Sequence, residues 1–215
     1  MIRLCFISLA ALTALWPQVL AAQSSDQAND SVRVGDRWVY DTKDEVTGYP
    51  KDTYTQIATE VSKDQIITSS TIRGKNGSTL IIFNRDWGLV DNVIWKYKPN
   101  NGQGLPATLA VGKEWRSQYE AKNTQNGANL KGTTSSKVVA REMITTDAGT
   151  FDAFKIERQA MELNTADPSK SFDAQIVTWF APQINRWVRR TFLVRFEKRT
   201  RSNTSEELAD FSRNF

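Results

Sequence analysis

Histidine is absent from this 215-residue sequence, and cysteine occurs only once, at position 5. Without histidine the chain cannot form a Ser-His-Asp triad, and with one cysteine it cannot form an internal disulfide. A metal site could use oxygen ligands only, and no calcium loop rich in Asp, Asn and Gly is present. The sequence therefore excludes the common nucleophilic and zinc-dependent mechanisms, and it predicts no cofactor.

Long apolar runs are equally scarce, and the one that occurs lies near the start. It extends from Leu4 to Leu15, follows the basic residue Arg3, and is succeeded by small residues. This order is typical of a secretory signal peptide. We expect residues 1–22 to be the signal, cut near Ala21 or Ala22; an uncleaved N-terminal anchor is the alternative.

Cys5 lies inside this apolar run, too early to be a lipid-attachment cysteine. We therefore expect a soluble mature protein in the periplasm or secreted, with no transmembrane segment and no disulfide. Such a protein depends on core burial for its stability. We expect a flexible leader over residues 23–32 and a single β domain over residues 33–215.

The charge is nearly balanced, since 28 basic residues face 24 acidic ones and the net charge is +4. A nucleic-acid-binding domain usually carries a much stronger basic excess. The expected export also argues against such a partner. We predict that the protein does not bind nucleic acid.

Alternation of apolar and polar residues dominates the chain beyond residue 33. Trp38 and Tyr40 share one face of a predicted strand, and Ile57 and Val61 share the apolar face of another. Gly, Asn, Asp and Pro separate these runs, and no amphipathic helix of normal length appears; we expect 206–211 to belong to the last strand. The pattern predicts an all-β fold with one antiparallel, strongly curved sheet, a half-barrel or open barrel.

One pattern occurs twice: Val34-Gly35-Asp36-Arg37-Trp38 is echoed by Val111-Gly112-Lys113-Glu114-Trp115. Each copy precedes an alternating strand. Two interpretations stay open, namely two similar strand entries or two structurally related halves of one curved sheet.

Three short motifs carry a family resemblance. They are Gly149-Thr150-Phe151 followed by Lys155-Ile156, then Trp179-Phe180-Ala181-Pro182, and the Val-Gly-x-x-Trp entry at 111–115. Together they resemble uncharacterised bacterial periplasmic β-domain proteins, the TapB-like and related families of unknown function. The resemblance implies an exported β domain related in shape to lipoprotein-carrier half-barrels, and it implies no catalytic residue.

A curved sheet offers its concave face to a ligand. The apolar side chains expected there are Val93, Trp95, Trp115, Tyr119, Phe192 and Val194. Arg189 and Arg195, from a basic run near the C-terminus, would meet a head group at the rim. The alternatives are that the aromatic residues form an ordinary core, and that the arginines pair across the sheet with acids such as Glu157 or Glu162.

Three functions follow in order of preference. The first is a non-enzymatic envelope protein that binds a lipid or other amphiphile. The second is a scaffold whose interior is filled and which binds an envelope protein partner. The third, remote, is a hydrolase that uses carboxylates at strand ends, such as Asp41 with Asp44 or Asp86 with Asp91, although Asp is also common in ordinary turns.

Overall fold

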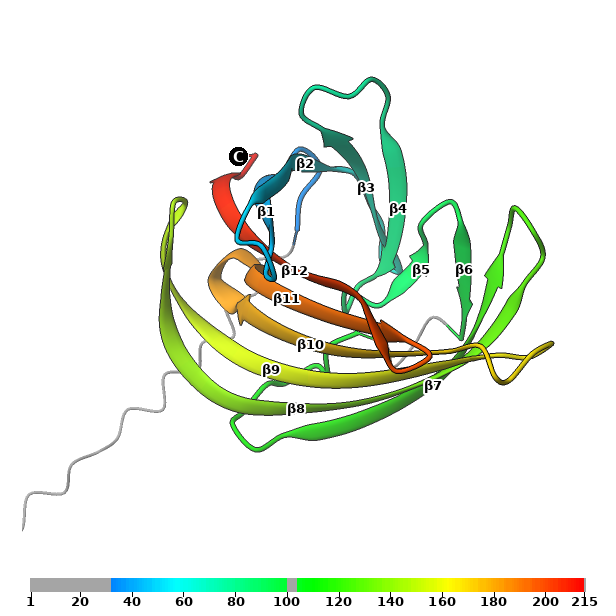
Figure 1. The fold of residues 1–215 in the computed structure, drawn as a ribbon. Coiled ribbons are helices and arrows are strands. Elements are labelled where there is room, and N and C mark those ends of the chain that lie inside the picture. Colours follow the sequence, from blue (N-terminus) through cyan, green and yellow to red (C-terminus); the bar gives the residue numbers. More distant parts are fainter. Residues whose placement is uncertain (1–31, 100–103, 215) are drawn as a thin grey trace, which may run out of the picture.

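The computed structural model describes residues 32–99 and 104–214. The expected signal peptide and nearly all of the expected leader lie outside these residues. Twelve strands and one short 3-10 helix, η1, make up the described part (Figure 1). Their bounds are β1 Arg37–Asp44, β2 Pro50–Val61, β3 Gln65–Ile72, β4 Thr79–Asn84, β5 Leu89–Asp91, β6 Trp95–Lys98, β7 Glu114–Asn123, β8 Asn129–Thr146, β9 Gly149–Asn164, β10 Ser171–Ala181, η1 Pro182–Ile184, β11 Arg186–Phe196 and β12 Arg199–Ser212.

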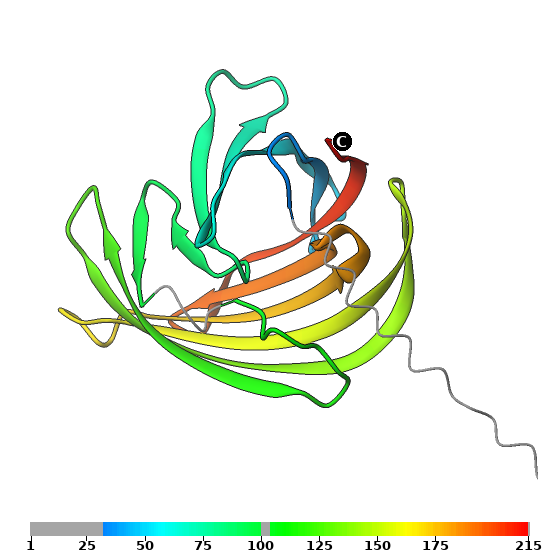
Figure 2. The ribbon, with the colours of Figure 1, turned by 180° about the vertical axis from the view of Figure 1, so that it is seen from behind.

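The strands form one antiparallel sheet that closes on itself. Each strand pairs with its neighbours in chain order, and β1 also pairs with β12, where Arg37 lies opposite Ser212. The all-β prediction and the strand over 206–211 are confirmed, but the open half-barrel is wrong. Closure satisfies the backbone groups that edge strands would leave unpaired. The long strands β7 to β11 curve around one side, and β1 to β4 lie across from them (Figures 1 and 2).

Irregular pairing shifts the register at several points of the barrel. One such shift lies on β2, where pairing with β3 jumps between Ala58 and Glu60. Gln56 and Ala58 are buried there, while Ile57 is 38% exposed. The prediction that Ile57 and Val61 share one face is therefore wrong, because Val61, beyond the irregularity, packs against the main core.

The repeated Val-Gly-x-x-Trp pattern forms the same structure twice. The amide of Gly35 donates to the carbonyl of Ala58, and the amide of Gly112 donates to that of Val138, both at 2.8 Å. Both glycines have φ near +90°, a conformation that other residues rarely adopt. The two copies are therefore similar strand entries, and they precede the first and the seventh of twelve strands.

Aromatic rings fill the end of the barrel at which η1 joins β10 to β11. Trp38 packs edge-on against Trp87, with ring centroids 6.0 Å apart, and Trp87 packs likewise against Trp187 at 5.6 Å. Arg186 is fully buried among them, with its guanidinium 3.4 Å from the Trp187 centroid and its Nε 3.3 Å from the Tyr40 hydroxyl. This end of the barrel is closed by side chains.

Within the described ranges, no helix is long and apolar enough to cross a membrane, and the single helix, η1, covers three residues.

Candidate ligand-binding cavity

A cavity of about 480 Å³ lies in the barrel beside this aromatic cluster. Its volume falls within the range of about 300–1,000 Å³ typical of small-molecule sites. Eleven of its nineteen lining residues are apolar, and the other eight carry charged, amide or hydroxyl groups. The lining residues are Gln56, Ile81, Phe83, Trp87, Leu89, Asn92, Tyr97, Tyr119, Thr134, Arg158, Ala160, Glu162, Phe172, Ala174, Ile176, Trp187, Arg190, Phe192 and Val194.

Small side chains in one interior row create this space. Five neighbouring strands place residues opposite one another in that row, and none of the side chains is large. They are Ser117, Thr134, Ala160, Ala174 and Val194. The rows on either side hold bulkier groups, so the empty volume is bounded along the barrel axis. Because strand pairing fixes which residues lie opposite one another, the small size of these five side chains determines where the cavity lies.

Arg158 on β9 lines this cavity and has no acidic partner among the described residues. Its Nε donates to the Ser136 hydroxyl at 3.0 Å, and its Nη2 donates to the Gly104 carbonyl at 3.3 Å. Among the described residues it forms no ion pair. Burial, followed by the nearby charge of Arg190, lowers the pKa of Arg158 to about 10. It is a largely enclosed cation held by neutral partners.

Arg190 on β11 also lines the cavity but has an acid partner. Its Nε lies 2.5 Å from Oε1 of Glu206, which stands directly opposite on β12. The Tyr54 hydroxyl donates to the other carboxylate oxygen at 2.5 Å. Burial alone would lower the pKa of Arg190, but Glu206 and Tyr54 together raise it above its ordinary value. Burial and then Glu206 raise the pKa of Tyr54.

A second polar group lies at the other end of the cavity. The Tyr119 hydroxyl donates to Oε1 of Glu162 at 2.6 Å, and the Tyr97 ring packs 5.7 Å from that of Tyr119. Burial, and then Glu162, raises the pKa of Tyr119. Gly132 stands opposite Tyr119 on β8, where a side chain would overlap the tyrosine ring.

The structure brings only part of the predicted concave face to this cavity. Tyr119, Phe192 and Val194 line it. Trp115 shares their side of the sheet, but its indole donates to the Gly104 carbonyl at 3.1 Å, and its ring packs against the main core.

Two other predicted residues lie away from the cavity. Trp95 packs against the small cluster around Tyr119, Ala121 and Leu130. Val93 lies before β6 with φ of +74° and is 54% exposed, so its predicted place on the concave face is wrong. The turn before β6 breaks the alternation of inward and outward side chains, so the face of Trp95 does not predict the face of Val93.

The two predicted rim arginines point out of the barrel. Arg189 pairs with Glu207 at 2.5 Å, and Arg195 pairs with Asp173 at 3.2 Å, both on neighbouring strands. Neither lines the cavity, so the expected rim role finds no support in the geometry. Cross-strand pairing of the basic run does occur, with acids of β10 and β12 in place of the β9 acids that we expected.

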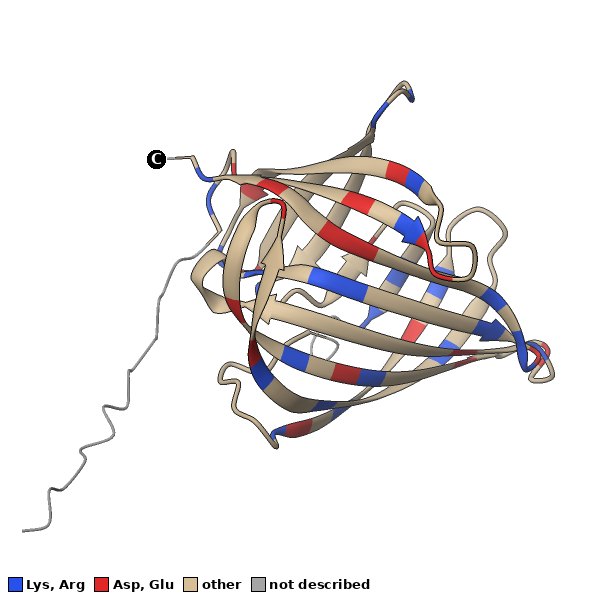
Figure 3. Cartoon of the chain, turned by 60° about the vertical axis from the view of Figure 1, so that its left-hand side comes forward, with Lys and Arg blue, Asp and Glu red and all other residues tan. Residues whose placement is uncertain are grey.

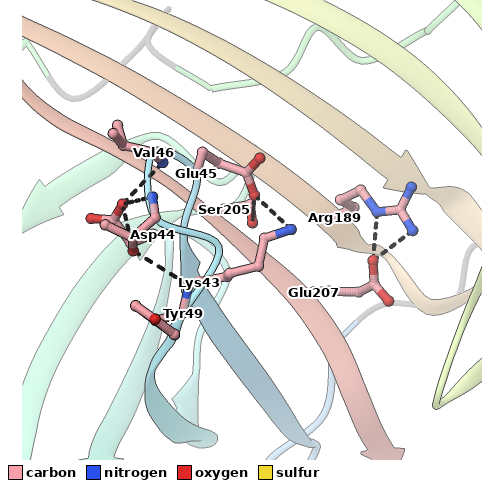
Figure 4. A network of polar contacts seen from close by, with 9 residues as sticks. Lys43, Asp44, Glu45, Val46, Tyr49, Arg189, Ser205 and Glu207 are labelled. Atoms are coloured by element: carbon pink, nitrogen blue, oxygen red, sulfur yellow. Dashed lines mark hydrogen bonds and ion pairs between the residues drawn. The ribbon is translucent and has the colours of Figure 1, made fainter.

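Similar contacts cover the outer surface near the first hairpin (Figure 4). Glu45 accepts a hydrogen bond from the Ser205 hydroxyl at 2.6 Å and lies 3.1 Å from the Lys43 ammonium. Basic and acidic residues are interspersed along the wall of the barrel in the view of Figure 3. This pattern is typical of a solvated surface.

The strand-end carboxylates bind local backbone or neighbouring side chains. Asp44 accepts the amides of Val46 and Thr47, both at 2.9 Å, and Asp91 accepts the amide of Val93 at 2.6 Å. In the part of the chain that the structure describes, no group of three or more His, Cys, Asp or Glu could hold a metal ion. These are the contacts of turn residues.

Sequence reasoning missed the charged side chains inside the barrel. Arg158 and Glu162 lie an even number of positions from Phe154 and Ile156 on β9, and these two apolar residues are buried. This spacing was the signal in the sequence that places all four side chains on one face. Charged residues on a strand usually face water, and that expectation points to the opposite face.

Comparisons with known proteins agree with this fold. A candidate lipoprotein from Parabacteroides distasonis is 13% identical, with a TM-score of 0.56 over 84% of this chain and 96% of its own. A candidate exported protein with a YmcC-like fold from Bacteroides fragilis, also 13% identical, gives 0.51 over 85% and 97%. The hypothetical lipoprotein YmcC from Escherichia coli, 6% identical, gives 0.50 over 88% and 90%.

No curated protein matches the chain in sequence. The similarity to the solved structures supports the fold alone. A family model does match, over residues 99–190, which extend from the end of β6 into β11. The predicted resemblance to an uncharacterised bacterial family of unknown function is therefore confirmed, and the family that the chain matches over these residues is the DUF3108-like family.

Proposed function

We propose that this chain is a non-enzymatic, exported envelope protein that binds an apolar or amphipathic ligand inside its barrel. The observation that carries the proposal is the cavity of about 480 Å³ between the aromatic cluster and the Tyr119 end. Small side chains keep it open, whereas a purely structural barrel of this size would be expected to fill its interior to normal packing density.

The composition of the walls supports an amphipathic ligand. Apolar side chains such as Ile176, Phe192 and Val194 offer a surface for a hydrocarbon chain. Arg158 and the Tyr119–Glu162 pair offer polar contacts at fixed places, as sites for organic ligands commonly do. The signal-like start of the sequence, and the exported or lipoprotein descriptions of the structural neighbours, support an envelope or secreted location.

A neutral fluorescent probe tests the proposal directly. N-phenyl-1-naphthylamine should bind the folded mature protein saturably, near one probe per chain, and binding should vanish in denaturing urea. Mass spectrometry of an organic extract, made after gentle purification from the native compartment, should show a stoichiometric amphiphile. Weak binding that does not saturate, together with a clean extract, would refute the proposal and favour a scaffold with a filled interior.

A further inference from the structure

The closed end of the cavity carries more positive than negative charge. Arg158, Arg186 and Arg190 all place their guanidinium groups inside the barrel there. Among the described residues, only Glu206 pairs with any of the three. Three cations inside the barrel beside one carboxylate leave an uncompensated positive field, which an interior of low dielectric constant makes stronger than it would be in water.

Arg158 is the one of these cations that lines the cavity without an acidic partner among the described residues. Arg186 is enclosed by aromatic rings and bound by Tyr40 and Gln56. Arg190 is engaged by Glu206. Arg158 lines the cavity and uses two of its five N–H donors on neutral acceptors, which leaves three donors for a ligand.

The surroundings of Arg158 give the ligand a direction. Ile176 stands opposite it on β10 and Phe192 stands opposite Ile176 on β11, so apolar wall begins at the guanidinium. The row of small residues follows next along the barrel axis. Glu162 lies four residues further along β9, about 13 Å away at 3.3 Å per residue. An acid group would be repelled at the Glu162 end and attracted at the Arg158 end.

We propose that the ligand is a single-chain amphiphile with an anionic head, a carboxylate or a phosphate monoester. Arg158 binds the head, and the chain extends along Ala160, Ala174 and Val194 toward Tyr119. This proposal rests on the proposed function, and it adds the class of ligand and its orientation. A planar guanidinium suits both kinds of head because it can donate two parallel hydrogen bonds to either.

The test compares cis-parinaric acid with its methyl ester, a matched pair of fluorescent probes that differ in charge. The wild-type protein should bind the acid about tenfold or more tightly than the ester, as a charge-assisted hydrogen bond implies. Arg158→Gln should reduce this ratio to near one while it retains ester binding. Arg189→Gln removes an outward-facing arginine of the same type and should leave the ratio unchanged.

The outcomes separate this proposal from the proposed function. Equal binding of acid and ester to wild type would overturn the anionic head but leave a ligand cavity, whereas no saturable binding of either probe would overturn both. An unchanged ratio in Arg158→Gln would also overturn the role of Arg158. Should that variant fail to fold, the wild-type ratio and Arg158→Lys, which keeps the charge and should keep a preference for the acid, decide the question. Competition by dodecyl phosphate and by dodecanoic acid then identifies which head is preferred.

Discussion

The Arg190–Glu206 pair offers a sharp test of the interior electrostatics. Glu206→Gln would keep the shape of the side chain but remove the negative charge that faces Arg190. The Glu206 side chain is only 9% exposed and that of Arg190 is 24% exposed, so water can replace the lost partner only in part. Removal of one member of a buried ion pair costs about 3–5 kcal/mol. Because Gln can still accept from Arg190 or Tyr54, we expect the lower part of this range, about 3 kcal/mol, in the free energy of unfolding.

The adjacent outward pair is a matched control. Glu207→Gln removes the partner of Arg189, where the two side chains are 41% and 33% exposed. Surface pairs contribute about 0–1 kcal/mol, so this change should cost less than about 1 kcal/mol. Equilibrium unfolding in urea, followed by tryptophan fluorescence, measures both. Equal losses in the two variants would refute the inward placement of Arg190 and with it the charge count inside the barrel.

Three further predictions concern the cavity and its walls. Gly132→Ala should destabilise the protein by about 1–3 kcal/mol in urea unfolding, because the new Cβ would overlap the Tyr119 ring; a neutral effect would contradict this packing. Ala174→Phe should abolish saturable N-phenyl-1-naphthylamine binding and leave the far-ultraviolet circular dichroism of the barrel unchanged; retained binding would place the probe elsewhere. Burial and Arg190 lower the pKa of Arg158 from 12.5 to about 10, so affinity for cis-parinaric acid should be constant from pH 7 to 9 and fall above pH 10. Between about pH 10 and 12.5 the native state binds fewer protons at this group than the unfolded state, so the contribution of Arg158 to the free energy of unfolding should rise with pH there. Affinity that does not fall above pH 10 would contradict the lowered pKa of Arg158.

Local patterns in the sequence predicted most strands because one face of each is buried. Trp38 and Tyr40 lie two positions apart on β1, and both are fully buried, as expected. Tyr119 and Phe192 were likewise placed on the inner face and line the cavity. Side-chain period along a strand is a local property, so a single sequence suffices to recognise it.

Closure of the barrel depends on information that local patterns do not hold. β1 pairs with β12, which lies at the other end of the described chain, and their register shifts between Val39 and Tyr40. The irregularity on β2 likewise places Ile57 and Val61 on opposite faces, since one extra residue on a strand turns every later side chain to the other face. Alternation can show that a strand has two faces, but it cannot show where the alternation breaks.

The charged interior shows that the face on which a strand residue lies must be considered together with its partner on the neighbouring strand. Arg189 and Arg190 are neighbours on β11, and Glu206 and Glu207 are neighbours on β12, so the hairpin forms two ion pairs on opposite faces. The outer pair is solvated and adds little. The inner pair neutralises itself and leaves Arg158 as the cation inside the cavity that only a ligand could neutralise. The composition of the sequence as a whole, with its small net charge, conceals this local excess, and the proposed preference for an anionic head depends on the strand register that places Arg158 inside the barrel.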